Sequence, residues 1–195
     1  MLFEYIAVFS NMFAFLLPPF RQYRGRYFLF FLVLAFGDPL TLFAIKIAHI
    51  TPSNFNSLIA WATFLSVFTI NRKSKGFFFL LILTIMVALT FIFFNRQQAQ
   101  LLNILINCLL LIYFIKESAQ YFQRTSEIHL GYFLLVLYQI GIITKLYTIA
   151  EYTKQGILYF YIINLFEIIV AIFFTIYKVE NSPVFKLGNF GEQKL

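Results

Sequence analysis

The sequence predicts an all-α fold, a polytopic bundle of seven transmembrane helices with its N-terminus outside and its C-terminus in the cytoplasm. The first observation is composition, because 61% of the 195 residues are hydrophobic and only 12% are charged. Soluble domains have roughly 25% charged and 45–50% apolar residues, so this chain has too few polar side chains to cover a surface in water. The other two observations are a series of long apolar runs and an uneven distribution of lysine and arginine between the segments that connect them.

Each apolar run approaches the roughly 20 residues that a helix needs to cross about 30 Å of hydrocarbon. In chain order the seven predicted spans are residues 1–17, 27–48, 54–70, 76–94, 99–115, 129–148 and 156–177. The first run has no basic region before it and no clean cleavage site, so we expect a retained span rather than a signal peptide. Strands of a β-barrel would be about 10 residues long and alternate in polarity, which these runs do not do.

Short polar connectors separate the runs. A bundle with such connectors places sequential helices antiparallel and side by side. Residues 18–26 form the first connector and residues 116–128 the fifth. Residues 1–178 therefore form the predicted membrane domain, and residues 179–195 a short cytoplasmic tail.

The distribution of basic residues predicts the orientation, because cytoplasmic connectors are enriched in lysine and arginine. Alternate connectors and the tail together hold eleven, namely Arg21, Arg24, Arg26, Arg72, Lys73, Lys75, Lys116, Arg124, Lys178, Lys186 and Lys194. The opposite side holds four, namely Lys46, Arg96, Lys145 and Lys154. An odd number of spans preserves this segregation. We expect a multi-pass protein of a bacterial inner (plasma) membrane.

Two acidic residues lie deep inside the predicted spans, whereas Glu4 lies near the start of the first one. Asp38 in the second span and Glu167 in the seventh both fall near the bilayer midplane at 1.5 Å per residue. Ionisable groups at this depth usually face the interior of a bundle. Polar residues at helical spacing extend the pattern on other spans. The candidate ligand or proton site is Asp38, Glu167, Asn164, Gln139, Asn107 and Asn11, while Asn56, Thr63, Asn103 and Tyr138 belong to the same polar stripes.

Both acids also have a structural interpretation, as protonated or paired groups that hold helices together, and asparagine and glutamine can bridge helices in the same way. Asp38 precedes Pro39, which removes a helical hydrogen bond and favours a kink. Lys46 and Lys145 lie toward span ends, where we expect both to extend to the membrane surface. Pairing of Lys145 with Glu167 is the alternative, although their Cα atoms are separated by roughly 10 Å along the membrane normal.

Other chemistries have little support in the sequence. His49 and His129 are expected near opposite faces, and no metal-ligand cluster, phosphate-binding loop or nucleophile motif is present. We expect no cofactor and no metal. The net charge of +7 follows from the connectors, so we expect a lipid bilayer rather than nucleic acid as the partner.

The span pattern resembles small seven-helix bacterial membrane proteins that are similar to the membrane-embedded sensory part of histidine kinases. Residues 54–75 and 114–177 carry this resemblance, including the KESAQYFQRTSE and YIINLFEIIVAIFFTIY stretches. It implies a non-enzymatic sensory or accessory module that acts through helix packing, with another membrane protein or a signalling kinase as partner.

Two other resemblances imply different functions. LLPPFRQYRGR resembles a degenerate PQ-loop segment of SWEET-like carriers, with Pro19 where the glutamine would stand. That resemblance implies a three-plus-one-plus-three helix plan and a small-solute carrier, proton-linked through Asp38 and Glu167. FGDPLTL is similar to a Gly-Asp motif of lysoplasmalogenase-like membrane enzymes. A polar cavity that joins Asp38 to Glu167 would favour the carrier over the sensory module.

Overall fold

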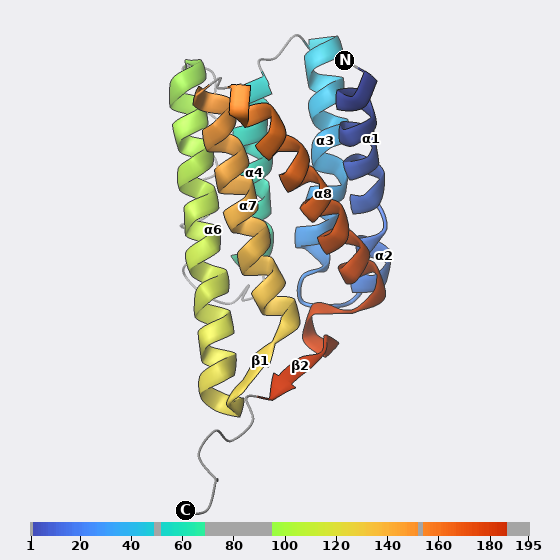
Figure 1. Ribbon diagram of the computed structural model, residues 1–195, viewed down its shortest axis with the longest axis vertical. Coiled ribbons are helices and arrows are strands. Elements are labelled where there is room, and N and C mark those ends of the chain that lie inside the picture. The colour runs from blue at the N-terminus through green and yellow to red at the C-terminus, as the bar shows by residue number, and fades with distance from the viewer. Residues whose placement is uncertain (1, 49–51, 69–94, 152–153, 187–195) are drawn as a thin grey trace, which may run out of the picture.

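The computed structural model describes residues 2–48, 52–68, 95–151 and 154–186 (Figure 1). Four of the described helices are long and apolar enough to cross a membrane, with candidate spans at Phe28–Ile47, Arg96–Thr125, Leu130–Thr148 and Leu158–Ile176. The prediction of a largely helical chain with membrane-spanning helices is confirmed at this level. The predicted fourth span, residues 76–94, lies outside the described residues, so the count of seven stays a prediction.

The helices follow the predicted runs closely. They are α1 (Leu2–Phe15), α2 (Pro18–Gln22), α3 (Phe28–Ala48), α4 (Pro52–Phe68), α6 (Arg96–Thr125), α7 (Leu130–Glu151) and α8 (Lys154–Ile176). Two three-residue strands, β1 (Glu127–His129) and β2 (Val184–Lys186), pair antiparallel, and a short 3-10 helix, η1 (Val179–Asn181), precedes β2. The fold is therefore all-α apart from this small sheet.

The predicted fifth connector is wrong, because most of it is helical. Helix α6 continues through residues 116–125, ten residues beyond the predicted span. No glycine or proline interrupts the sequence there, and its lysine, glutamate, alanine and glutamine residues favour helix. The helix begins at a capping box formed by Asn95 and Gln98 and ends at Ser126, whose φ of 55° is left-handed. At 30 residues it is about 45 Å long.

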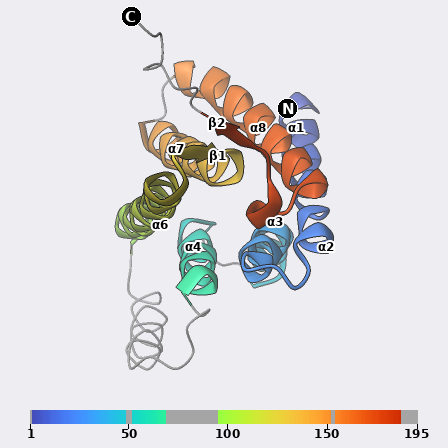
Figure 2. The same cartoon turned by 90° about the horizontal axis from the view of Figure 1, so that it is seen from below.

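Six helices form a ring in sequence order. Seen along the bundle in Figure 2, α1, α3, α4, α6, α7 and α8 follow one another, and α8 closes the ring by packing against α1. In this order α1 lies across the ring from α6, α3 from α7, and α4 from α8. Every described helix of the ring thus has one face toward a shared interior.

Side-chain contacts give the directions of the helices. Ser57, near the start of α4, donates a hydrogen bond of 2.7 Å to the carbonyl of Ala99, near the start of α6. Adjacent helices α4 and α6 therefore run in the same direction. Gln100 donates to the carbonyl of Leu146 near the end of α7, so α6 and α7 are antiparallel. We call the end of the bundle with α2, β1 and β2 the strand end, and the end where α4 and α6 begin the far end (Figure 1).

Aromatic side chains fill the half of the bundle nearest the strand end. Phe31 of α3 contacts Phe174 of α8 with ring centroids 4.9 Å apart, and Phe30 contacts Phe114 of α6 at 5.5 Å. Tyr27 completes the cluster, and all five side chains are almost completely buried. Since phenylalanine and tyrosine each bury a large apolar area, this cluster forms an apolar core in the strand-end half.

The strand end is held by hydrogen bonds to the last turn of α8. Gln22, fully buried on α2, donates through Nε2 to the carbonyls of Phe174 and Tyr177 at 3.0 and 2.8 Å and accepts from the amide of Val179. The last carbonyls of a helix have no hydrogen-bond donor within it, so Gln22 supplies donors that α8 itself lacks. Arg26 forms an ion pair with Glu117 of α6 at 2.7 Å.

The first residues of the predicted tail are part of the folded domain. Ser182 is buried, accepts a hydrogen bond from the amide of Gly131 at 2.8 Å and lies 3.1 Å from Nδ1 of His129. Strand β2 then pairs with β1 through Ile128 and Phe185. The described part of the tail therefore packs against the start of α7.

This contact needs a glycine at position 131, which gives the first testable prediction. A Cβ there would lie 2.5 Å from Oγ of Ser182 and 3.0 Å from the carbonyl of Val179. Gly131→Ala should lower the free energy of unfolding by about 1–3 kcal/mol, the usual cost of overpacking. Thermal unfolding in detergent measures the change.

Gly141→Ala is the matched control in the same helix. Its Cβ would meet ordinary contacts, the nearest at 3.6 Å, and alanine favours helix over glycine by about 1 kcal/mol. We expect an unchanged or raised melting temperature for this variant. Equal melting temperatures for the two variants would contradict the close approach at Gly131.

Candidate functional site

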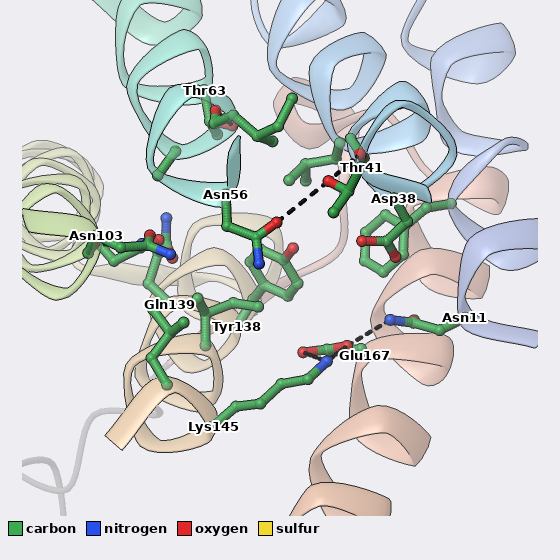
Figure 3. A pocket seen from close by; sticks show the side chains of 18 residues that line it. Asn11, Asp38, Thr41, Asn56, Thr63, Asn103, Tyr138, Gln139, Lys145 and Glu167 are labelled. Carbon is green, nitrogen blue, oxygen red and sulfur yellow. Dashed lines mark hydrogen bonds and ion pairs between the residues drawn. The ribbon is translucent and has the colours of Figure 1, made fainter. Parts of the chain in front are cut away.

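A cavity of about 210 Å³ lies inside the ring, in the half of the bundle toward the far end. Residues of α1, α3, α4, α6, α7 and α8 line it (Figure 3). Its volume is many times the roughly 10–15 Å³ that one water molecule needs by the same measure. Such a space is large enough for a small solute and smaller than a typical drug-binding pocket.

The structure brings the six predicted site residues together. Asn11, Asp38, Asn107, Gln139 and Glu167 all line the cavity. The sixth, Asn164, accepts a hydrogen bond from Lys145, which is also a lining residue. The polar stripes predicted on separate helices therefore face one another.

The most strongly bonded group in the cavity is an ion pair between Lys145 of α7 and Glu167 of α8. Nζ of Lys145 lies 2.9 Å from Oε2 and 3.2 Å from Oε1 of Glu167, and 2.8 Å from Oδ1 of Asn164. Nδ2 of Asn11 on α1 donates to Oε2 of Glu167 at 2.6 Å (Figure 3). The Glu167 side chain is only 2% exposed. One buried carboxylate thus joins three helices.

The expected extension of Lys145 to the membrane surface is wrong. Its side chain turns into the bundle, where Nζ also lies 5.1 Å from the centre of the Phe160 ring. The separation of roughly 10 Å between Lys145 and Glu167 that the sequence predicts is a separation of Cα atoms. Side chains lean toward the N-terminus of their own helix, and α7 and α8 are antiparallel, so Lys145 and Glu167 lean toward each other. This lean, together with two long side chains, closes the separation.

Hydroxyl and amide groups line the side of the cavity opposite α8. Thr41 is one helical turn beyond Asp38; its Oγ1 lies 3.2 Å from Oδ1 of Asn56 and donates to the carbonyl of Gly37 at 2.8 Å (Figure 3). Asn107 donates to the side chain and the carbonyl of Asn103 at 2.9 and 2.8 Å. The sequence interpretation included the asparagines but not Thr41. The spacing of Thr41 from Asp38 was the available signal.

Three predicted residues hold polar atoms without a hydrogen bond in the described part of the chain. They are Oδ1 of Asn11, Oε1 of Gln139 and Nδ2 of Asn164, and the side chains concerned are 6%, 1% and 2% exposed. Buried polar atoms usually have a partner, and orphans cluster where water or a ligand completes the bonding. Asp38 lies beside them, exposed on the cavity side of α3, and no hydrogen bond or ion pair within the described residues engages its carboxylate.

The lining is rich in groups that can bind a polar solute. It includes no serine, histidine or cysteine among the described residues. Across the described ranges no three histidine, cysteine or acidic side chains lie close enough to hold a metal ion. What the cavity offers is carboxylate, ammonium, amide and hydroxyl groups around an empty volume, which is the chemistry of recognising a small polar molecule.

Comparisons of the chain with protein-family models, curated proteins and solved structures find no match. The three resemblances drawn from the sequence therefore stay predictions.

The ion pair gives the second testable prediction. Lys145→Met leaves the Glu167 carboxylate buried without its cation, and breaking a buried pair from one side costs about 3–5 kcal/mol. We expect a melting temperature well below wild type for this variant. The double variant Lys145→Met/Glu167→Gln removes both charges and should recover most of the loss.

Lys46→Met is the matched control, because Lys46 is an exposed lysine near the end of α3. Its stability should stay within about 0.5 kcal/mol of wild type. If the two single variants were equally stable, or if the double variant were no better than Lys145→Met, the pair would not hold the helices as described.

Proposed function

We propose that this protein is a non-enzymatic, multi-pass membrane carrier that binds a small polar solute in the cavity between its helices. One observation carries the proposal: a polar cavity joins Asp38 to Glu167 inside the ring. An accessory protein that acted only by packing would need an apolar, closed interior instead. Carriers bind solutes between helix repeats inside the membrane, and a cavity enclosed by six helices suits that role.

The proposal includes seven spans. Helix α4 ends at the strand end and α6 begins at the far end, as their parallel contact requires. The predicted fourth span, residues 76–94, is part of the sequence between them and is long and apolar enough to cross a membrane. With this span included, the ring order supports a three-plus-one-plus-three plan in which each helix of the first triple faces its counterpart in the second.

The orientation is proposed from charge. The strand end carries seven described basic residues, namely Arg21, Arg24, Arg26, Lys116, Arg124, Lys178 and Lys186. Four basic residues lie toward the far end, namely Lys46, Arg96, Lys145 and Lys154. Because cytoplasmic segments are enriched in lysine and arginine, we place the strand end in the cytoplasm and the N-terminus outside, in an inner (plasma) membrane. The cavity then lies in the outer half of the bundle, and the aromatic cluster closes the cytoplasmic half.

A sensory or accessory module is the second candidate function. The aromatic cluster and the hydrogen bonds of Gln22 hold the strand end closed, and a receptor needs no opening there. Helix α6 is about 45 Å long, whereas the hydrocarbon is about 30 Å thick, so its last turns and the small sheet extend beyond it. That projecting surface would be the contact for a second membrane protein or a signalling kinase.

Uptake by proteoliposomes tests the carrier proposal. We expect at least one isotope-labelled probe from a panel of ethanolamine, glycine, glycerol and urea to enter faster than into protein-free liposomes. Asp38→Asn should reduce that uptake by about tenfold or more, since it removes a charge from the binding site. Glu127→Gln, which removes a carboxylate on β1 far from the cavity, is the matched control and should transport normally.

Two results would contradict the proposal. If the folded protein bound a probe in a manner dependent on Asp38 but admitted none of the panel, the carrier proposal would be wrong and the sensory candidate would stand. Uptake that is equal in wild type and a folded Asp38→Asn variant would contradict a role for this cavity.

A further inference from the structure

The charges around the cavity do not balance. Among the described lining residues, Glu167 and Asp38 are acidic and Lys145 is the single base. Nζ of Lys145 pairs with Oε2 of Glu167 at 2.9 Å. Among the described residues, the carboxylate of Asp38 therefore has no cation in direct contact. An uncompensated charge inside a bundle is costly, so the site favours a proton or a ligand with one positive charge.

The unsatisfied atoms around this charge are chiefly hydrogen-bond acceptors. Nδ2 of Asn11 donates to Glu167, so the atom left free on that amide is its carbonyl oxygen. Oε1 of Gln139, whose side chain is 1% exposed, is also free of partners within the described residues. The lining residues thus hold three acceptors without a partner, of which the carboxylate of Asp38 belongs to an exposed residue and the two amide oxygens are buried. An ammonium group has three donors and no acceptor, whereas an anion would add a further acceptor.

We infer that the ligand of this cavity is a small solute with one protonated primary amine, whose ammonium group pairs with Asp38. This inference rests on the proposed role of the cavity in solute binding. The bundle already holds one ammonium in this way, because Nζ of Lys145 lies between a carboxylate, Glu167, and an amide oxygen, that of Asn164. Asp38 of α3 and Gln139 of α7 supply the same two acceptor types from facing sides of the cavity (Figure 3).

The rest of the lining indicates what the amine is attached to. Apolar side chains from α3, α4 and α7, namely Leu34, Ile59, Ile142 and Leu146, suit a short hydrocarbon segment. Thr41 and Asn56 suit an uncharged polar group at its other end. The volume of about 210 Å³ limits the solute to a short chain. A free amino alcohol has all these properties. The ethanolamine headgroup of a phospholipid shares the ammonium group but has a phosphate ester in place of the hydroxyl.

Binding to the full-length protein in detergent tests the inference, with isothermal titration calorimetry as the readout. The probes are ethanolamine, which is protonated at pH 7, ethylene glycol as its uncharged analogue and glycolate as its anionic analogue. We expect wild type to bind ethanolamine and to bind the other two at least about tenfold more weakly. Asp38→Asn should weaken ethanolamine by a similar factor, while Glu127→Gln should leave it unchanged.

Equal binding of ethanolamine and ethylene glycol would overturn the inference, and so would wild-type ethanolamine affinity in a folded Asp38→Asn variant. If Asp38→Asn fails to fold, the comparison of the three probes on wild type decides the question. Short-chain phosphatidylethanolamine and phosphatidylcholine separate the two sources. Competition by the first lipid alone supports a headgroup ligand, and competition by neither supports a free amine.

The outcomes also separate this inference from the carrier proposal. Ethanolamine binding without uptake into proteoliposomes would contradict the carrier and leave the amine ligand intact. Uptake of glycerol or urea that falls in Asp38→Asn, by a protein that neither binds nor admits ethanolamine, would contradict the amine ligand and leave the carrier intact.

Discussion

The bundle depends on one buried carboxylate, that of Glu167, and on the groups that compensate its charge. In a medium of low dielectric a carboxylate is tolerated only when it is paired and hydrogen-bonded. Lys145 supplies the charge from α7, Asn11 supplies a donor from α1, and Asn164 binds the same lysine from within α8. These contacts bring three helices around one point and keep polar atoms in the interior. An apolar core cannot close over them, so a cavity remains beside the pair.

The two halves of the bundle differ in the side chains that face the interior on either side of Glu167. Toward the strand end the inward residues are Phe30, Phe31, Phe114 and Phe174, which pack tightly and exclude polar groups. Toward the far end amides, hydroxyls and Asp38 face the cavity together with aliphatic side chains such as Leu34 and Ile142. A molecule built in this way holds a solute in one half and seals the other half. In a carrier the aromatic cluster is the part that must rearrange, whereas in a receptor it stays closed.

Sequence reasoning found the helices and the faces they turn inward, because both depend on local periodicity. Asn164, Glu167 and Ala171 recur at helical spacing, and all three are buried in α8. The direction of the Lys145 side chain could not be predicted from periodicity, because it depends on two antiparallel helices whose side chains lean toward each other. The extension of α6 and the packing of Ser182 against Gly131 depend on contacts between distant segments, which no periodicity reports.

The central claim is that the ring encloses a cavity that a solute can enter. Cysteine accessibility tests it most directly, with Cys108 replaced by alanine and a positively charged methanethiosulfonate as reagent. Asn56→Cys, on the cavity wall, should react quickly in the folded protein, and Ala171→Cys, fully buried in the aromatic half, should not. Ethanolamine should slow the reaction of Asn56→Cys, because it would occupy the same cavity. An Asn56→Cys variant as inert as Ala171→Cys would show that the interior is closed and would contradict the account.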